Sequence, residues 1–304
     1  MSEAANDSTS ETQMKSYFEN YILVDVGANL TNRKFNRDLE SVVARAKDSG
    51  VQKIIVSSTS IKGSREALRL SRIYPGTLYA TAGVHPHEAK SWSDESLAEL
   101  RDIASNIECV AIGECGLDYN KNFSPPEIQR LVFKQQVELA CELRKPLCIH
   151  ERDAHEDMLA ILEEHKDSLP PLVLSSYSGS CAQAQKYLQM GMYLGLTGYI
   201  SKDNSENGVQ ALLEGGDLSL DRLLIQTDSP FMYPNARASK LPERVKEALT
   251  ERSLSFLQRY CTFQRNEPCS LPTIVEMIAA FLRRTPEDIA LTTSFNALKV
   301  FGLS

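Results

Sequence analysis

Eight short apolar runs rich in Val, Ile and Leu recur along the chain, and amphipathic segments of helical period lie between them. The apolar runs span residues 22–27, 51–58, 77–84, 108–114, 145–150, 171–176, 192–200 and 222–228. The helical segments include residues 38–50, 65–74, 96–104, 128–144 and 156–165. Apolar strands that alternate with helices are typical of a parallel sheet covered by helices. Eight such units predict a single-domain (β/α)8 TIM-like barrel, with a doubly wound open sheet as the alternative.

The composition is that of a globular protein with one large core. The chain has 304 residues, of which 42% are hydrophobic, and it has no apolar stretch near the roughly 20 residues that cross a bilayer. Residues 1–20 lack the pattern of a signal peptide and are predicted to be a disordered lead to a barrel over 21–304. Seven cysteines without a CxxC pair favour reduced thiols in an intracellular compartment, cytoplasmic or nuclear. The oligomeric state stays open, and a monomer is compatible with the sequence.

Ionisable residues follow five different apolar runs at the point where each run ends. They are Asp25, His85, Glu114, His150 and Asp228. In a closed barrel of parallel strands the carboxyl ends of the strands meet around one mouth, where such enzymes have their active sites. A lone histidine or carboxylate in such a place is more often structural, but five together favour a metal site. Carboxylates with imidazole suit Mg²⁺, Mn²⁺ or Zn²⁺.

Basic residues are frequent in the segments that leave the strand ends. The net charge of −7 excludes a generic basic surface for nucleic acid, but a local positive mouth on an acidic body would attract a phosphate backbone. The alternative is a set of solvated loop charges. Tyrosines in the same loops are candidates for base stacking or for packing at the rim. The basic residues are Arg33, Lys34, Arg37, Lys121, Arg152, Lys202 and Arg237, and the tyrosines are Tyr119, Tyr177, Tyr199 and Tyr233.

Several motifs resemble those of one family over residues 22–301. They are VDVGANLTN from residue 24, AGVHPH from 82, VAIGECGLDYNKNFSPPE from 110, H-x-R-D at 150–153, TDSP at 227–230 and RNEPCSLP at 265–272. The chain is similar in these segments to the TatD-type metal-dependent deoxyribonucleases, which are amidohydrolase-like TIM barrels. The resemblance implies a divalent metal ion and hydrolysis of phosphodiester bonds in DNA, often from the 3′ end of single strands.

The resemblance also implies roles for individual residues. Glu114, His150 and Asp228 fall on the family's metal ligands, and Asp228 is also the general base. His85 and Arg152 fall on positions that contact phosphate or water. Arg33 and Lys121 join them as expected substrate-binding residues, because they belong to the basic loops. Mg²⁺ is the preferred ion, since it accepts several waters and oxygen ligands, with Mn²⁺ or Zn²⁺ as alternatives. The expected partner is DNA, as single strands or 3′ ends.

Two positions depart from the family pattern. Ser175 stands where the family has a histidine ligand, in SSYSGS in place of HCFTGS, and Gln226 replaces the glutamate of ETDAP. A hydroxyl is a poorer ligand than an imidazole, so the metal site is expected to be weaker. The alternative function is therefore a TatD-type fold with a weakened or lost metal site that acts as a nucleic-acid or protein-binding module. Metal-dependent hydrolysis of another substrate is a third reading, which the basic mouth disfavours.

Two acidic residues of the motifs are interpreted as partners of arginines. Asp118 and Glu267 are expected to orient Arg152 or Arg265 through paired carboxylate and guanidinium groups. The segment 234–264 is expected to be either a lid over the mouth or a surface insertion.

Overall fold

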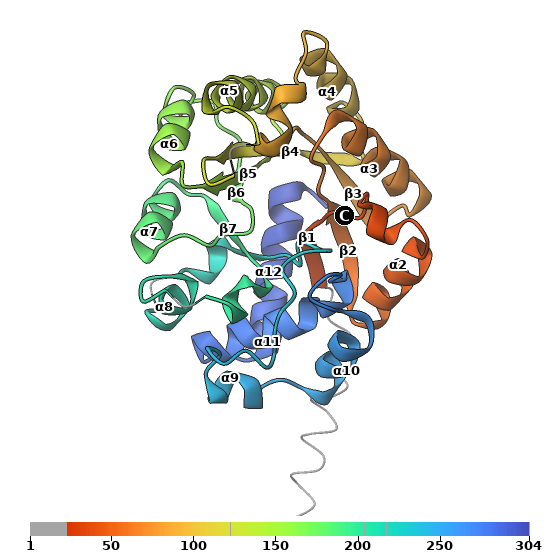
Figure 1. The fold of residues 1–304 in the computed structure, drawn as a ribbon, viewed down its shortest axis with the longest axis vertical. Coiled ribbons are helices and arrows are strands. Elements are labelled where there is room, and N and C mark those ends of the chain that lie inside the picture. The colour runs from red at the N-terminus through yellow and green to blue at the C-terminus, as the bar shows by residue number, and fades with distance from the viewer. Residues whose placement is uncertain (1–22, 122, 204, 217, 304) are drawn as a thin grey trace, which may run out of the picture.

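A computed structural model describes residues 23–303 except 122, 204 and 217 (Figure 1). Its strands form one eight-stranded parallel sheet in the order β1 to β8. They are β1 (Leu23–Ala28), β2 (Val51–Val56), β3 (Leu78–Ala82), β4 (Cys109–Asp118), β5 (Leu147–Arg152), β6 (Leu172–Leu174), β7 (Tyr193–Leu196) and β8 (Leu223–Ile225). The predicted order of eight parallel strands is confirmed, although β6, β7 and β8 are shorter than their apolar runs.

Helices connect successive strands and cover the outside of the sheet (Figure 1). The longer ones are α2 (Leu39–Asp48), α3 (Ile61–Ile73), α4 (Ser96–Ala104), α5 (Pro126–Leu143), α6 (His155–Glu163), α7 (Cys181–Gln189), α10 (Glu251–Tyr260), α11 (Leu271–Leu282) and α12 (Pro286–Phe301). The shorter ones are η1 (Arg33–Phe35), η2 (Pro86–Ser91), η3 (Gly198–Ser201), α8 (Val209–Glu214), η4 (Leu220–Arg222), α9 (Glu243–Glu247) and η5 (Pro268–Ser270). In the described part of the chain, none of these helices combines the length and apolar character needed to cross a membrane.

The first and last strands close the sheet into a barrel. Just beyond β8, the Asp228 amide donates to the Gly27 carbonyl at 2.8 Å, and the Asn29 amide donates to the Ser229 carbonyl at 2.7 Å. These contacts place β8 beside β1 and bring the carboxyl ends of all eight strands around one mouth. The fold is therefore the TIM-like barrel and not the open doubly wound sheet.

Two sequence predictions have different outcomes here. The lead predicted for residues 1–20 lies outside the described residues. The segment 234–264 contains α9 and α10, which pack against α11 and η5 beside the barrel, and no described residue of this segment lines the pocket at the mouth. This placement matches the surface insertion and not the lid.

Two glycines allow β4 to lie close enough to β5 for the strands to pair. Gly113 has φ +136° and Gly116 has φ +128°, in the region that side chains rarely adopt. A Cβ atom on Gly116 would lie 2.0 Å from the His150 carbonyl oxygen, and one on Gly113 would lie 2.5 Å from that of Cys148. The β4 register also shifts between Ile112 and Cys115. This irregularity falls on Glu114, and bulges of this kind change where a side chain points.

We expect Gly116→Ala to destabilise the fold more than Gly76→Ala does. Gly76 also has positive φ, +73°, but a Cβ atom there meets nothing within 4 Å. The Gly76 variant therefore measures the backbone strain alone, about 1–2 kcal/mol. The Gly116 variant adds a backbone clash with the strand that holds His150. Urea unfolding of both variants gives the two losses of unfolding free energy, and equal losses would contradict the close-approach argument.

Candidate active site

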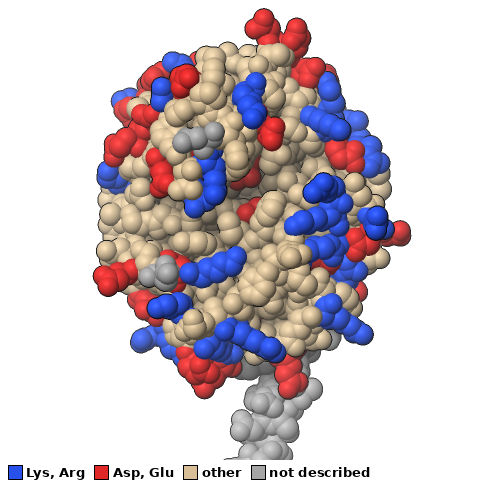
Figure 2. Space-filling model, viewed as in Figure 1, with Lys and Arg blue, Asp and Glu red and all other residues tan. Residues whose placement is uncertain are grey.

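A pocket of about 550 Å³ lies at the mouth of the barrel, where strand ends meet. Its lining comes from at least six strand ends and includes Asn29, His85, His87, Glu114, Asp118, His150, Arg152, Ser176 and Asp228. Figure 2 shows a hollow with acidic side chains inside and Lys and Arg side chains around it. A larger cavity of about 900 Å³, between Tyr193 of β7 and α12, has no histidine among its described lining residues. The strand-end ionisable groups therefore identify the smaller pocket as the candidate site.

Two carboxylates in this pocket, Glu114 and Asp228, lie close enough for the charge of Glu114 to act on Asp228. Burial raises the pKa of Asp228 well above its ordinary value, the charge of Glu114 raises it further, and a hydrogen bond from the Ser176 hydroxyl opposes the rise. Burial also raises the pKa of Glu114, although the nearby His150 and His87 lower it in part. Two partly desolvated acids with so little compensating positive charge provide a site for a cation.

Asp118 orients two histidines toward the centre of the pocket. Its Oδ2 atom lies 2.7 Å from His87 Nε2 and 3.1 Å from His150 Nε2. Burial would raise the pKa of Asp118, but hydrogen bonds from His150, His87 and the Lys121 amide lower it overall. The anionic carboxylate therefore accepts an Nε2–H from each ring. A neutral His150 then has an unprotonated Nδ1, and this atom lies 3.9 Å from Glu114 Oε1.

The described residues contain two groups that could hold a metal ion. His85, Glu114 and His150 place their ligand atoms within 4.8 Å of one another, and so do His87, Asp118 and His150. The groups share His150. Imidazole nitrogens and carboxylate oxygens are the donors that Zn²⁺ and Mn²⁺ accept, and the carboxylates suit Mg²⁺. Glu114 Oε1 and His150 Nδ1 are the donors of these groups that fit the divalent ion the sequence predicts, whereas Asp228 belongs to neither group.

His85 has the hydrogen bonding of a neutral donor. Its Nδ1 accepts the backbone N–H of His87 at 3.2 Å, so the proton of the neutral ring lies on Nε2. Burial, followed by the charges of His150 and His87, lowers the pKa of His85 well below its ordinary value. An Nε2–H group in a pocket can donate to a phosphate oxygen or to water. The sequence assigns His85 this contact, which stays a prediction.

Asp25 is a correction to the expected cluster of five ionisable residues. The carboxyl group is fully buried and accepts hydrogen bonds from the amides of Gly27 and Thr227 and from the Thr227 hydroxyl. Burial raises the pKa of Asp25 to about 7, and these hydrogen bonds limit the rise. It does not belong to the pocket lining. It ties β1 to the end of β8 because its oxygens face the neighbouring strand instead of the mouth.

Two buried glutamines of α5 hold the strand ends that carry the histidines and Asp118. Gln136 accepts from the Val84 amide at 2.8 Å and donates to the Val84 carbonyl at 3.0 Å. Gln129 accepts from the Asp118 amide at 2.8 Å and donates to the Asp118 carbonyl at 3.1 Å. The two glutamines are seven residues apart, so they lie on the same helix face. One helix therefore fixes the backbone on both sides of the imidazole cluster.

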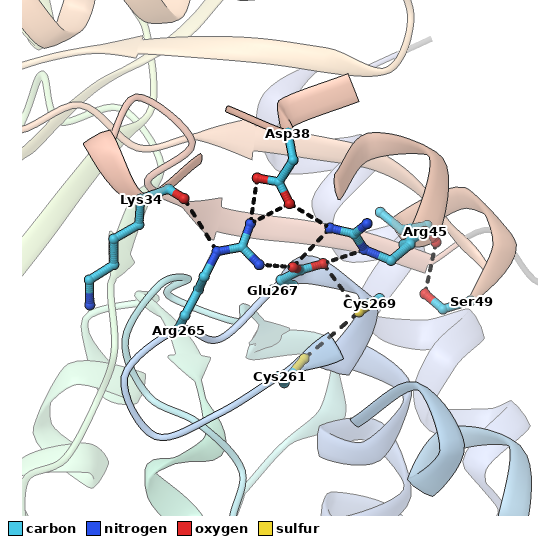
Figure 3. A network of polar contacts seen from close by, with 9 residues as sticks. Lys34, Asp38, Arg45, Ser49, Cys261, Arg265, Glu267 and Cys269 are labelled. Carbon is cyan, nitrogen blue, oxygen red and sulfur yellow. Dashed lines mark hydrogen bonds and ion pairs between the residues drawn. The ribbon is translucent and has the colours of Figure 1, made fainter. Parts of the chain in front are cut away.

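The RNEP motif forms a charge network with Asp38 and Arg45 of the α2 region (Figure 3). Buried Glu267 binds Arg45 at 2.8 Å and also binds Arg265, and Asp38 binds both arginines at 3.2 and 2.7 Å. The predicted pairing of Glu267 with Arg265 is therefore confirmed, whereas the pairing of Asp118 with an arginine is wrong because two imidazoles occupy that carboxylate.

The same motif holds the loop that follows β8. The Asn266 amide donates to the Pro230 carbonyl at 3.0 Å, and Asn266 Nδ2 donates to the Thr227 carbonyl at 3.2 Å. These residues flank Asp228 in the chain. RNEP therefore acts as a support for the backbone that presents Asp228.

The predicted substrate-binding residues differ in position. Arg152 and Lys121 line the pocket, whereas Arg33 is exposed on η1 and does not. Of the four tyrosines considered for stacking, none lines the pocket, and Tyr177 is buried and donates to the Ser180 carbonyl at 2.5 Å. Burial contradicts base stacking by Tyr177, and stacking by the other three tyrosines stays a prediction.

The structure places the two departures from the family pattern next to the pocket. Ser175 follows β6, and its amide donates to the Ile149 carbonyl at 2.8 Å. The next residue, Ser176, lines the pocket and accepts a hydrogen bond from Gln226 Nε2 at 3.0 Å. Gln226 Oε1 is buried and has no hydrogen-bond partner among the described residues. The assignment of Ser175 to the missing ligand position stays a prediction.

Four further residues line the pocket although the sequence predicted no site role for them: His87, Ser176, Phe123 and Phe231. A signal existed for His87, since it lies two residues after His85 across a proline, in the same strand-end motif. The two phenylalanines have no such signal, because each stands in a loop whose path only the tertiary structure determines.

We expect Asp118→Asn to weaken metal binding roughly 10- to 100-fold, the loss that follows when a partner that orients a metal ligand is removed. The amide keeps the shape but is a weaker acceptor for the two Nε2–H groups. Calorimetric titration with Mn²⁺ measures the change. Asp157→Asn is the control, since Asp157 accepts from Tyr119 on the outer side of the barrel, at 2.6 Å. Unchanged affinity in the Asp118 variant would remove it from the metal site.

Comparisons with known proteins show relatives over most of the chain. The family described as TatD related DNase matches residues 24–302. A protein of Cronobacter sakazakii named 3′-5′ ssDNA/RNA exonuclease TatD is 38% identical over 279 residues, which cover 92% of this chain and 97% of that protein. A Salmonella typhimurium protein of the same name is also 38% identical over 279 residues, with 92% and 98% covered.

Solved structures show the same architecture. The TatD homologue YjjV of Escherichia coli K12 is 26% identical and has a TM-score of 0.78. The match covers 93% of this chain and 98% of that one. A TatD family hydrolase of Entamoeba histolytica is 22% identical and has a TM-score of 0.81. The match covers 93% of this chain and 99% of that one. The resemblance drawn from GECGLDY and RNEP is therefore confirmed. The chain belongs to the TatD-related DNase family of metal-dependent hydrolases.

Proposed function

We propose that this protein is a divalent-metal-dependent exonuclease that removes nucleotides from the 3′ end of single-stranded nucleic acid. The observation that carries the proposal is the pocket at the mouth, where Glu114 and Asp228 lie with oriented imidazoles beside Arg152 and Lys121. An acidic floor suits metal ions, and a basic rim suits phosphates. The relatives named as 3′-5′ ssDNA/RNA exonucleases support the polarity and the single-stranded substrate.

Glu114, His150 and Asp228 would hold the metal ion. His150 would bind it through Nδ1, because its Nε2–H donates a hydrogen bond to Asp118. A bound divalent ion would lower the pKa of a coordinated water and withdraw charge from a phosphoryl oxygen. Mg²⁺ is the proposed ion, since carboxylates and waters satisfy it, and Mn²⁺ or Zn²⁺ would suit the imidazoles.

The remaining residues of the pocket bind and orient the substrate. His85 donates its Nε2–H to a phosphate oxygen, and Arg152 and Lys121 attract the phosphate charge, with Arg33 farther along the strand. Asp228 faces the pocket and accepts the proton of the attacking water. The water oxygen forms the new bond to phosphorus, and the bond from phosphorus to the 3′ oxygen of the preceding nucleotide breaks. That oxygen takes up a proton, so the products are a nucleoside monophosphate and a strand shortened by one nucleotide.

An intracellular location is part of this proposal. Among the described residues, Cys109, Cys115, Cys148, Cys261 and Cys269 are buried thiols outside any disulfide. Buried thiols without disulfides are typical of proteins from reducing compartments.

A second candidate function is nucleic-acid binding without hydrolysis. The observation in its favour is the hydrogen bond from Gln226 to Ser176, which puts a neutral amide beside the site where the family has a carboxylate. Against it, the chain retains the half-buried acids Glu114 and Asp228 and the carboxylate of Asp118, which a pure binding surface does not require. Hydrolysis is therefore the better-supported function.

Glu114→Gln tests the proposed function. We expect the variant to cleave a 5′-labelled single-stranded oligonucleotide at least roughly 10- to 100-fold more slowly, since loss of a ligand should cost no less than loss of a residue that orients one. The wild-type protein should give a ladder of products that shortens from the 3′ end. Gel analysis with Mg²⁺ measures both the rate and the polarity.

Glu276→Gln is the matched control for this experiment. Glu276 is a buried carboxylate held by Thr250 and Ser253 at 2.7 and 2.5 Å, and it does not line the pocket. A loss of activity only in the Glu114 variant supports its role in the site. Full activity of Glu114→Gln would refute that role, and internal cuts in place of the ladder would refute the exonuclease.

A further inference from the structure

Two exposed phenylalanines line the same pocket as the catalytic groups. Phe123 is 57% exposed and Phe231 is 49% exposed. Single exposed apolar side chains are common on protein surfaces and require no explanation. Two large rings that both border a pocket with a polar floor are different, because they offer flat apolar surface directly beside the proposed phosphate site.

The two rings come from opposite walls of the barrel. Phe123 follows β4, and Phe231 follows β8. In a closed barrel with the strand order β1 to β8, these strands are four positions apart in either direction. A strand lying across the mouth would therefore meet one ring on each side of the reactive centre.

Each phenylalanine makes a contact with an ionisable residue of the site. The Phe231 amide donates to the Asp228 carbonyl at 2.8 Å, so the turn that presents Asp228 also places this ring. The Phe123 ring meets the ring of His87 edge to face, with centroids 4.9 Å apart at 83°. The rings therefore have defined positions relative to the acid and imidazole groups.

Each ring also has a lysine nearby. Lys34 Nζ lies 5.9 Å from the Phe231 ring centroid and donates to the Gln264 carbonyl. Lys121, two residues before Phe123, lines the same pocket. An ammonium group beside an aromatic face matches the alternation of phosphate and base along a single strand.

We propose that Phe123 and Phe231, the aromatic pair, stack on bases on the two sides of the scissile phosphate. This inference rests on the proposed function and specifies its substrate. Stacking uses the π face that every base has, so the substrate is an unpaired strand of any sequence, and neither ring reads a 2′ hydroxyl. Bases within a duplex are already stacked and paired, so they are unavailable to these rings.

Phe123→Leu and Phe231→Leu test the aromatic pair, since leucine keeps the apolar bulk without the flat face. We expect each variant to lower kcat/KM for single-stranded cleavage roughly 5- to 150-fold, the equivalent of about 1–3 kcal/mol for one stacked base, mainly through KM. Phe123→Trp and Phe231→Trp should restore cleavage. Phe295→Leu is the matched control, because Phe295 is 64% exposed on α12 and lines the separate larger cavity.

An oligonucleotide with abasic sites at its 3′ end separates stacking from structural effects. The wild-type protein should cleave it poorly, and the leucine variants should lose nothing further. Equal losses on normal and abasic strands, or no loss on either, would overturn the aromatic pair while wild-type cleavage keeps the proposed function intact. If the wild-type protein cleaves no single strand, the proposed function fails, and the aromatic pair fails with it.

Discussion

The pair of acids inside the pocket, Glu114 and Asp228, is the constraint on which the site depends. Their burial opposes ionisation, and the charge of one further opposes that of the other. A chain that only needed to fold would gain by replacing such groups with neutral ones. A bound divalent cation would offset this cost, because it would supply the missing positive charge. The acids therefore connect the barrel architecture to metal-dependent chemistry.

The supports around the acids show how the fold keeps this costly arrangement in place. Gly113 and Gly116 let β4 approach β5, Gln129 holds the backbone of Asp118, and Asn266 holds the loop that contains Asp228. These contacts come from elements far apart in the chain. The most specific motifs, GECGLDY and RNEP, thus include backbone and charge contacts as well as reactive groups.

The sequence predicts the barrel and the strand-end location of the site. Both follow from the periodicity of the apolar residues and from the order of strands and helices along the chain. Glu114, His150 and Asp228 line the pocket as that logic requires. The direction of a side chain at a strand end depends on register and local bulges, which the pattern does not contain. Asp25 therefore faces Thr227, whereas Asp118 faces two histidines. Phe123 and Phe231 could not be predicted, because a loop position has no periodic signal.

The most direct test of the account is the location of a bound ion by anomalous diffraction from crystals of the protein soaked in Zn²⁺. We predict an ion about 2.0–2.2 Å from His150 Nδ1 and from a Glu114 carboxylate oxygen, with His150 Nε2 still hydrogen-bonded to Asp118. An ion bound elsewhere on the surface, with none between these two side chains, would contradict the account.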